Sequence, residues 1–239
     1  MLNPVIIALT FRATMGRKRA LLFAIPAVLL IAISALLTAV ARSGSWPPEF
    51  LGQFGFSVVL PLTALIIGTS VLGAEIDDGS VVHLLATPVS RAEVVLSKFV
   101  VAAVLTIAFA AIPEYLAALI AKGPASSLAV GLAAGALAAS VVYNALFVLL
   151  SVLTTRAIAV GLLYLLVWEG LLANLVPGVG LLSAGQYGLS VANSIAHNPA
   201  LHAHVGLGTA LVMGVIVTVV CLTLCTRRLA AFSIKGDAA

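Results

Sequence analysis

The chain has 239 residues, of which 62% are hydrophobic and only 8% are charged, and its mean hydropathy is +1.23. A soluble globular domain carries about a quarter charged residues, so this composition excludes that class. The formal net charge of +4 does not indicate nucleic-acid binding, because the basic residues are distributed by membrane side. We expect a protein embedded in the lipid bilayer, with no nucleic-acid partner.

Six apolar stretches are long enough to cross the roughly 30 Å hydrocarbon core of a bilayer. They lie near 21–41, 56–74, 94–121, 128–153, 157–176 and 205–225. Nothing between them is long enough for a soluble domain, so residues 1–239 are predicted to form one all-α transmembrane domain. With both termini in the cytoplasm, only Arg42 and Lys122 of the twelve Lys and Arg residues fall outside, as the positive-inside rule requires.

Two segments flank the first predicted span. In residues 3–16, Asn3 suits a helix cap and Pro4 the first helical position, and apolar residues face Arg12, which predicts a helix lying in the inner membrane interface. A frayed tail is the alternative. Residues 41–55 contain Trp46, two prolines and two phenylalanines, and are predicted to form an outer loop with an aromatic belt.

Small and polar residues mark the later spans. Gly131, Gly135 and Ala139 form a small-residue row that predicts close helix packing, within the subunit rather than at a dimer seam. Glu114 and Glu169 lie in the outer halves of the third and fifth spans, where a carboxylate is costly. With Asn144, they are candidates for a translocation pathway. The equal alternative for each glutamate is structural, accepting hydrogen bonds from the outer segment.

The segment from Pro177 to His204 contains no Lys or Arg. An apolar piece at 179–182, a polar break at 183–186 and a moderately apolar run to Ala196 predict one or two short re-entrant or surface helices on the outer side. His197, His202 and His204 could bind a metal, but an exposed loop with incidental histidines fits better, and no metal site is predicted.

No enzyme motif is found in the sequence. It lacks H-E-x-x-H and any Gly-Lys-Ser/Thr, and therefore a P-loop. Gly188-Leu189-Ser190 begins an incomplete nucleophile motif without a placed acid partner. We do not expect catalysis by this chain.

The longest stretch in which charged and helix-breaking residues interrupt the apolar sequence runs from Glu75 to Lys98. Asp77 and Asp78 suit a helix N-cap, and residues 79–87 can form a helix of about 13 Å. Pro88 ends that helix, and Ser90 with Glu93 forms a capping box that starts the next one. A helix so short cannot span a bilayer and is predicted to lie on the surface. An ordinary capped inner loop is the alternative.

This stretch closely resembles the signature of the ABC type-2 permease family, whose members are mostly exporters. The matching residues are Glu75, Gly79, Leu84, Leu85, Ala86, Pro88, Ser90, Arg91 and Lys98. Ser80 stands where threonine is usual, which is a mild departure. The position after the second span and the six-span layout also match the family.

The resemblance implies a permease subunit of an ATP-driven exporter in the bacterial cytoplasmic membrane. Residues 79–87 would be a cytoplasmic coupling helix that docks on a separate ATPase subunit, and 4–17 a connecting helix. ATP would bind that partner, so this chain would need no cofactor; two ATPase copies and a second, identical or different, permease subunit would complete the transporter. The predicted coupling residues are Glu75, Asp78, Gly79, Leu84, Leu85, Pro88 and Arg91.

Two other functions are alternatives to the permease. A proton- or ion-coupled carrier would use Glu114 and Glu169 as titrating sites. An intramembrane enzyme would need a catalytic constellation that the sequence does not contain. The substrate cannot be read from the sequence.

Overall fold

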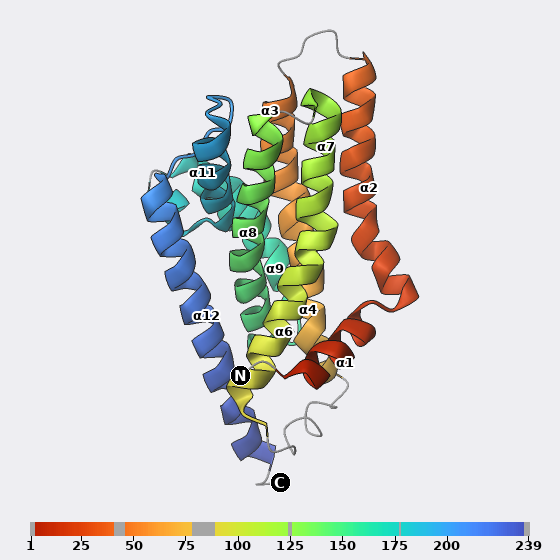
Figure 1. Ribbon diagram of the computed structural model, residues 1–239. Helices are drawn as coiled ribbons and strands as arrows, with labels where there is room; N and C mark the ends of the chain where they lie inside the picture. Colours follow the sequence, from red (N-terminus) through yellow and green to blue (C-terminus); the bar gives the residue numbers. More distant parts are fainter. Residues whose placement is uncertain (1–2, 41–45, 78–88, 124–125, 177, 237–239) are drawn as a thin grey trace.

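The computed structural model describes residues 3–40, 46–77, 89–123, 126–176 and 178–236, without the side chains of 17–19, 74–77, 174 and 232–236. These residues are helical with short connections and contain no β-strand, which confirms the all-α prediction. The long helices form one bundle, with α1 (Pro4–Thr14) across one end and α11 (Ala184–Ala196) near the other (Figure 1). We name these the α1 end and the α11 end.

Five helices within the described residues are long and apolar enough to cross a membrane. They are Ala20–Val40, Trp46–Gly73, Arg91–Lys122, Ser127–Leu153 and Leu207–Ala231, and they correspond to five of the six predicted spans. The predicted span 157–176 corresponds to a shorter apolar helix, Ala157–Leu172. The sixth crossing therefore stays a prediction.

The second span begins ten residues earlier than the sequence suggested. Helix α3 (Trp46–Phe50), the π-helical segment η1 (Leu51–Val59) and α4 (Leu60–Asp77) follow one another without a break, so the predicted loop is wrong from Trp46 onward. Two prolines occupy the first turn of α3, where a backbone N–H has no intrahelical partner to lose. The aromatic residues of the supposed belt are therefore helical.

Wide π-helical turns interrupt three of the bundle helices. The third predicted span comprises α6 (Arg91–Thr106), η2 (Ile107–Ala111) and α7 (Ile112–Lys122). The fifth comprises α9 (Ala157–Leu163), η3 (Tyr164–Leu172) and α10 (Ala173–Leu175). Pro61 and Pro113 each lie two positions after a π segment, and the wider turn relieves the clash that a proline ring makes inside a regular helix.

Helix α1 begins as predicted and ends earlier. The Asn3 Oδ1 accepts the Val5 N–H at 3.0 Å, but the helix stops at Thr14 instead of residue 17, and α2 (Arg17–Val40) starts after Gly16. The Asn3 N–H donates to Ser97 Oγ on α6 at 3.1 Å. This bond fastens the start of the chain to the third span.

Helix α8 (Ser127–Leu153) lies in the middle of the bundle and packs most closely against α11 (Figure 1). A Cβ at Gly131 would lie 2.6 Å from the Ala192 carbonyl oxygen, and one at Gly135 would overlap that of Gly188. In return, a Cβ at Gly188 would lie 2.9 Å from the Gly135 oxygen. The small-residue row is therefore used within the chain, as predicted.

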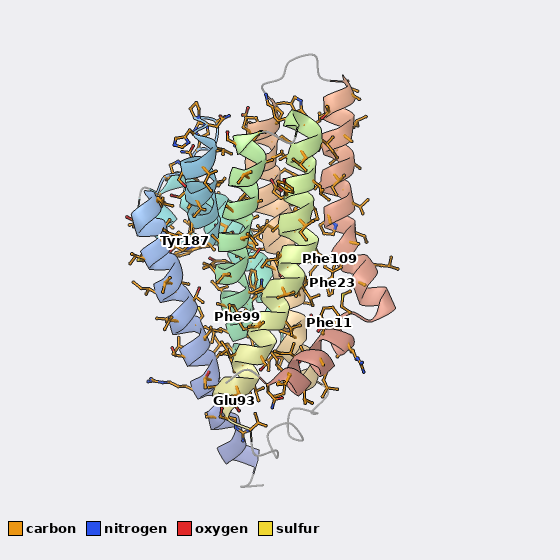
Figure 2. All side chains as sticks on the ribbon, viewed as in Figure 1. Phe11, Phe23, Glu93, Phe99, Phe109 and Tyr187 are labelled. Atoms are coloured by element: carbon orange, nitrogen blue, oxygen red, sulfur yellow. The ribbon has the colours of Figure 1, made fainter. Side chains whose placement is uncertain are left out.

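Helices α2 and α12 (Leu207–Gly236) lie at the edges of the bundle. Only 22% and 11% of their most apolar stretches are buried by the rest of the chain. The Ser34 hydroxyl joins α2 to α7 by donating to the Ala117 carbonyl at 2.9 Å, and Phe23 meets Phe109 edge to face (Figure 2). Their apolar outer faces remain available to lipid.

We predict that Gly135→Ala destabilises the protein, because the added methyl group meets backbone that can move only with the whole of α11. Overpacking of this kind costs about 1–3 kcal/mol. The measurement is thermal unfolding of the purified protein in detergent. Gly73→Ala is the matched control, since its Cβ would be 3.7 Å from Ser151 Cβ, an ordinary contact; equal melting temperatures for both variants would contradict the tight α8–α11 contact.

Candidate functional site

Most of the predicted coupling residues lie outside the described residues. Asp78, Gly79, Leu84, Leu85 and Pro88 belong to this group. Glu75 lies on α4, whose backbone is described but whose side chain at this position is not, and Arg91 is the first residue of α6 and half-buried. The role of these residues in coupling stays a prediction. The described residues show only how α4 and α6, the helices before and after this segment, are held together.

Lys98 joins those two helices from inside the bundle. Its side chain is fully buried, and its Nζ donates to the Val71 carbonyl oxygen on α4 at 2.8 Å. A buried ammonium group must find such partners because desolvation is costly. The contact is near the carboxyl-terminal turns of α4, where the helix dipole also favours a cation. Lys98 therefore couples the position of α6 to that of α4.

The start of α6 is fixed in the way that the sequence indicated. Ser90 Oγ accepts the Glu93 N–H at 3.3 Å, which is the N-cap half of the predicted capping box. One turn further along α6, Ser97 binds the Asn3 backbone. Thus α6 is attached to both α1 and α4, close to the end of α4 and the start of α6.

Glu169 organises the opposite end of the bundle. Its Oε1 accepts the Ala184 N–H at 2.9 Å and the Tyr164 hydroxyl at 3.1 Å, and its Oε2 accepts the Ser183 hydroxyl. Ser183 and Ala184 open helix α11. A carboxylate is favoured there by the free N–H groups and by the helix dipole. Glu169 therefore makes the hydrogen bonds that the structural alternative expected, while its role in a pathway stays a prediction.

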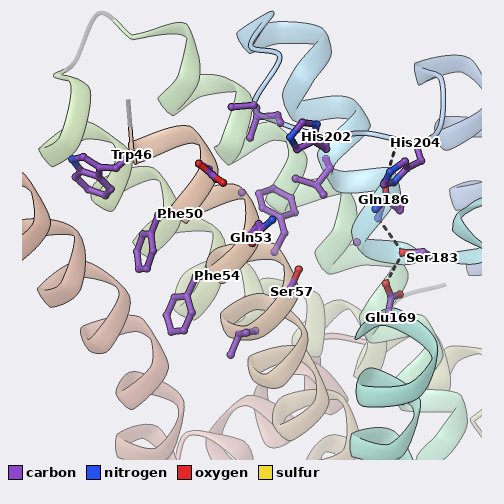
Figure 3. A pocket seen from close by; sticks show the side chains of 18 of the residues that line it. Trp46, Phe50, Gln53, Phe54, Ser57, Glu169, Ser183, Gln186, His202 and His204 are labelled. Carbon is purple, nitrogen blue, oxygen red and sulfur yellow. Dashed lines mark hydrogen bonds between the residues drawn. The ribbon is translucent and has the colours of Figure 1, made fainter. Parts of the chain in front are cut away.

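The α11 end is further tied together by Ser183 and Gln186 (Figure 3). Ser183 Oγ accepts the Gln186 N–H at 3.1 Å, and Gln186 Oε1 accepts the His204 N–H at 3.0 Å. The predicted re-entrant segment is accordingly a 3₁₀ turn, η4 (Val179–Leu182), followed by α11. The predicted polar break at 183–186 contains the cap of the second helix.

Glu114 and Asn144 lie elsewhere. The Glu114 side chain is 2% exposed and packs against Gly55 of η1, where a Cβ would overlap its carboxylate. Its Oε1 has no hydrogen-bond partner among the described residues. Asn144 is fully buried, with Nδ2 donating to the Ser140 carbonyl at 2.7 Å and Oδ1 accepting from Thr106 at 3.2 Å. The three pathway candidates are therefore not brought together.

A cavity of about 820 Å³ opens at the α11 end (Figure 3). One wall comes from α3 and η1, and the other from η3, α11 and the connection to α12. Of the three pathway candidates, Glu169 lines this cavity, and Glu114 and Asn144 do not. His202 and His204 also line it, while the described residues contain no group of three His, Cys, Asp or Glu side chains placed to hold a metal ion.

The sequence analysis did not identify the residues that fix the helices at the two ends of the bundle. It treated Lys98 only as part of a motif, and Tyr164 and Ser183 were not singled out. The serine that opens a helix after an apolar turn was a usable signal for Ser183. The contacts of Lys98 with Val71 and of Glu114 with Gly55 depend on helix rotation, for which the sequence holds no direct signal.

We predict that Ser183→Ala lowers the melting temperature, since it removes both the N-cap of α11 and a donor to Glu169. Loss of an N-cap alone costs about 1 kcal/mol, and a buried carboxylate that loses a donor adds to this. Ser194→Ala on the same helix is the control, because its hydroxyl donates only to the nearby Val191 carbonyl. Equal stability of the two variants would refute the anchoring role.

The comparison with known families accords with this geometry. The family model described as ABC-2 family transporter protein matches residues 15–178, more than half of the chain and including the stretch from Glu75 to Lys98. No curated protein gives a significant match. Five apolar helices of spanning length belong to the same chain. The protein is therefore an integral, multi-pass membrane protein that belongs to the ABC-2 transporter family.

Proposed function

We propose that this chain is the permease subunit of an ATP-binding-cassette exporter. The observation that carries the proposal is the family match, which contains the whole stretch resembling the permease signature. Membership of the family implies partnership with an ABC ATPase in general. The absence of a P-loop from the sequence is consistent with ATP hydrolysis on another subunit.

In the proposed mechanism, residues 79–87 form the coupling helix and dock on the ATPase in the cytoplasm. Leu84 and Leu85 would anchor in its groove, with charged residues around them. Movement of the docked helix would reach the membrane through α4 and α6, whose relative position is fixed by Lys98. Two ATPases and two permease subunits would then switch the bundle between inward- and outward-facing states.

The contacts and exposure of α1 support placing the α1 end at the cytoplasmic side of the membrane. Helix α1 is attached to α6 through the Asn3–Ser97 hydrogen bond and buries Ile6, while Val5 and Leu9 remain exposed. An exposed apolar face on a helix that crosses the end of the bundle suits the membrane interface. We propose that α1 moves with α6 and keeps the coupling segment at a fixed depth.

We expect the double variant Leu84→Asp/Leu85→Asp to lose ATPase binding and ATP-dependent transport, because two charges cannot enter an apolar groove without a large desolvation cost. The measurements are co-purification of an ABC ATPase subunit from native membranes and substrate release from cells or inverted vesicles. A loss of about tenfold or more in recovered ATPase is expected, since hot-spot residues contribute at least about 2 kcal/mol each.

The control is Thr155→Asp, which adds a charge to the exposed turn between α8 and α9. It should retain both ATPase binding and transport. If the double variant also retained both, residues 79–87 would not be the coupling helix. Recovery of the chain from native membranes without any ATPase would overturn the permease function itself.

A second candidate function rests on Glu114. A carboxylate that is 2% exposed and has one oxygen without a partner among the described residues is a feature of proton- or ion-coupled carriers. Such a carrier would work without ATP and stop when a protonophore collapses the gradient, and Glu114→Gln would abolish it. The exporter proposal expects the reverse: dependence on ATP, insensitivity to the protonophore, and transport retained in Glu114→Gln.

A further inference from the structure

The cavity at the α11 end has the size of a small-molecule site. Its volume of about 820 Å³ falls within the range of roughly 300–1,000 Å³ typical of ligand pockets. It extends around both sides of the helix formed by α3 and η1 (Figure 3). Gln53 and Ser57 face the side where Gln186 and Glu169 lie, whereas Trp46, Phe50 and Phe54 lie on the other side of the helix.

The ionisable groups of the cavity have an uneven sign. Its ionisable lining residues are the carboxylates Glu49 and Glu169 and the imidazoles His202 and His204, and none is a lysine or arginine. Glu49 is exposed at the start of the second span. Glu169 is held in place by donors from Ser183, Ala184 and Tyr164. A concave site lined by one sign of charge with apolar walls concentrates ligands of the opposite sign.

The aromatic side chains of the cavity form a continuous row. Trp46 meets Phe50 with ring centroids 6.0 Å apart at 62°, and Phe50 stacks on Phe54 at 5.2 Å and 15°. Aromatic faces attract cations, most strongly at Trp, when the cation lies within about 6 Å of the ring centroid. Glu49 lies on the same short helix as Trp46 and Phe50, and all three line the cavity.

We propose that this cavity binds lipophilic organic cations, of the quaternary ammonium or phosphonium type. The aromatic row accommodates the body of such a ligand and Glu49, from the same helix, complements its charge, while Glu169 adds negative charge on the other side of that helix. An organic anion would meet two carboxylates and no fixed cation among the lining residues. Under the proposed function, which it deepens, the inference identifies the class of substrate that the exporter carries.

The test uses the purified chain in lipid nanodiscs, without any ATPase. The sequence has two tryptophans, so Trp168→Phe leaves Trp46 as the only indole and a reporter inside the cavity. Tetraphenylphosphonium is titrated while Trp46 fluorescence is recorded, with empty nanodiscs subtracted. Tetraphenylborate, which has the same four phenyl rings and the opposite charge, is the matched ligand control. We expect saturable quenching by the cation only.

Two variants separate charge from shape. Glu49→Gln should weaken phosphonium binding roughly threefold to fivefold, as expected for one exposed charge contribution. Phe50→Leu, which keeps apolar volume and removes a ring face, should weaken it by a similar factor. Glu93→Gln is the control, because it removes a carboxylate at the α1 end of the bundle and glutamine also suits a capping box; its affinity should be unchanged.

Equal quenching by tetraphenylborate, quenching that never saturates, or unchanged affinity in both Glu49→Gln and Phe50→Leu would overturn the inference. These outcomes are distinct from failure of the exporter proposal, because the binding measurement needs no ATPase. Cation binding without ATP-driven transport would count against the exporter alone. ATP-driven transport of other compounds without cation binding would count against the ligand class alone.

Discussion

The contact between Glu169 and the start of α11 is the interaction on which the α11 end depends. A carboxylate inside an apolar bundle and the free N–H groups at the start of a short helix are both costly in isolation. Here they are paired, since Ala184 and Ser183 donate to Glu169 and Tyr164 adds a third donor. Because α11 also packs on the small-residue row of α8, one residue of η3 positions the α11 end of the bundle.

A corresponding arrangement holds the α1 end. Lys98 is fully buried and bonds to the backbone of α4, while Ser97, its neighbour on α6, bonds to the backbone of Asn3. Each polar group is satisfied by a carbonyl or an N–H of another helix, as an apolar environment requires. At both ends of the bundle, these buried polar side chains join separate helices.

Much of the fold could be predicted because hydrophobicity and helix-breaking residues are local signals. The span at 128–153, the cap at Ser90 and one or two short helices within residues 179–196 were predicted from the sequence, although α11 begins at Ala184, inside the predicted polar break. The start of the second span was not, because prolines and aromatic residues suit both a loop and the first turns of a helix. The separation of Glu114 from Glu169 was also hidden, since equal depth does not fix which way two helices face.

The π-helical segment η1 has a consequence for how the chain can vary. In its wide turn, the Leu60 N–H reaches the Gly55 carbonyl, five residues earlier, whereas an α-turn would reach back four. If one residue between Leu51 and Val59 were removed and the wide turns were kept, the preceding turn would rotate by roughly 80–100° relative to α4. The aromatic row would then swing away from the cavity while Pro61 stayed in place. The number of residues in this segment is therefore constrained as strictly as their identity. Deletion of a single residue there would change the direction of all the side chains that precede it on the helix.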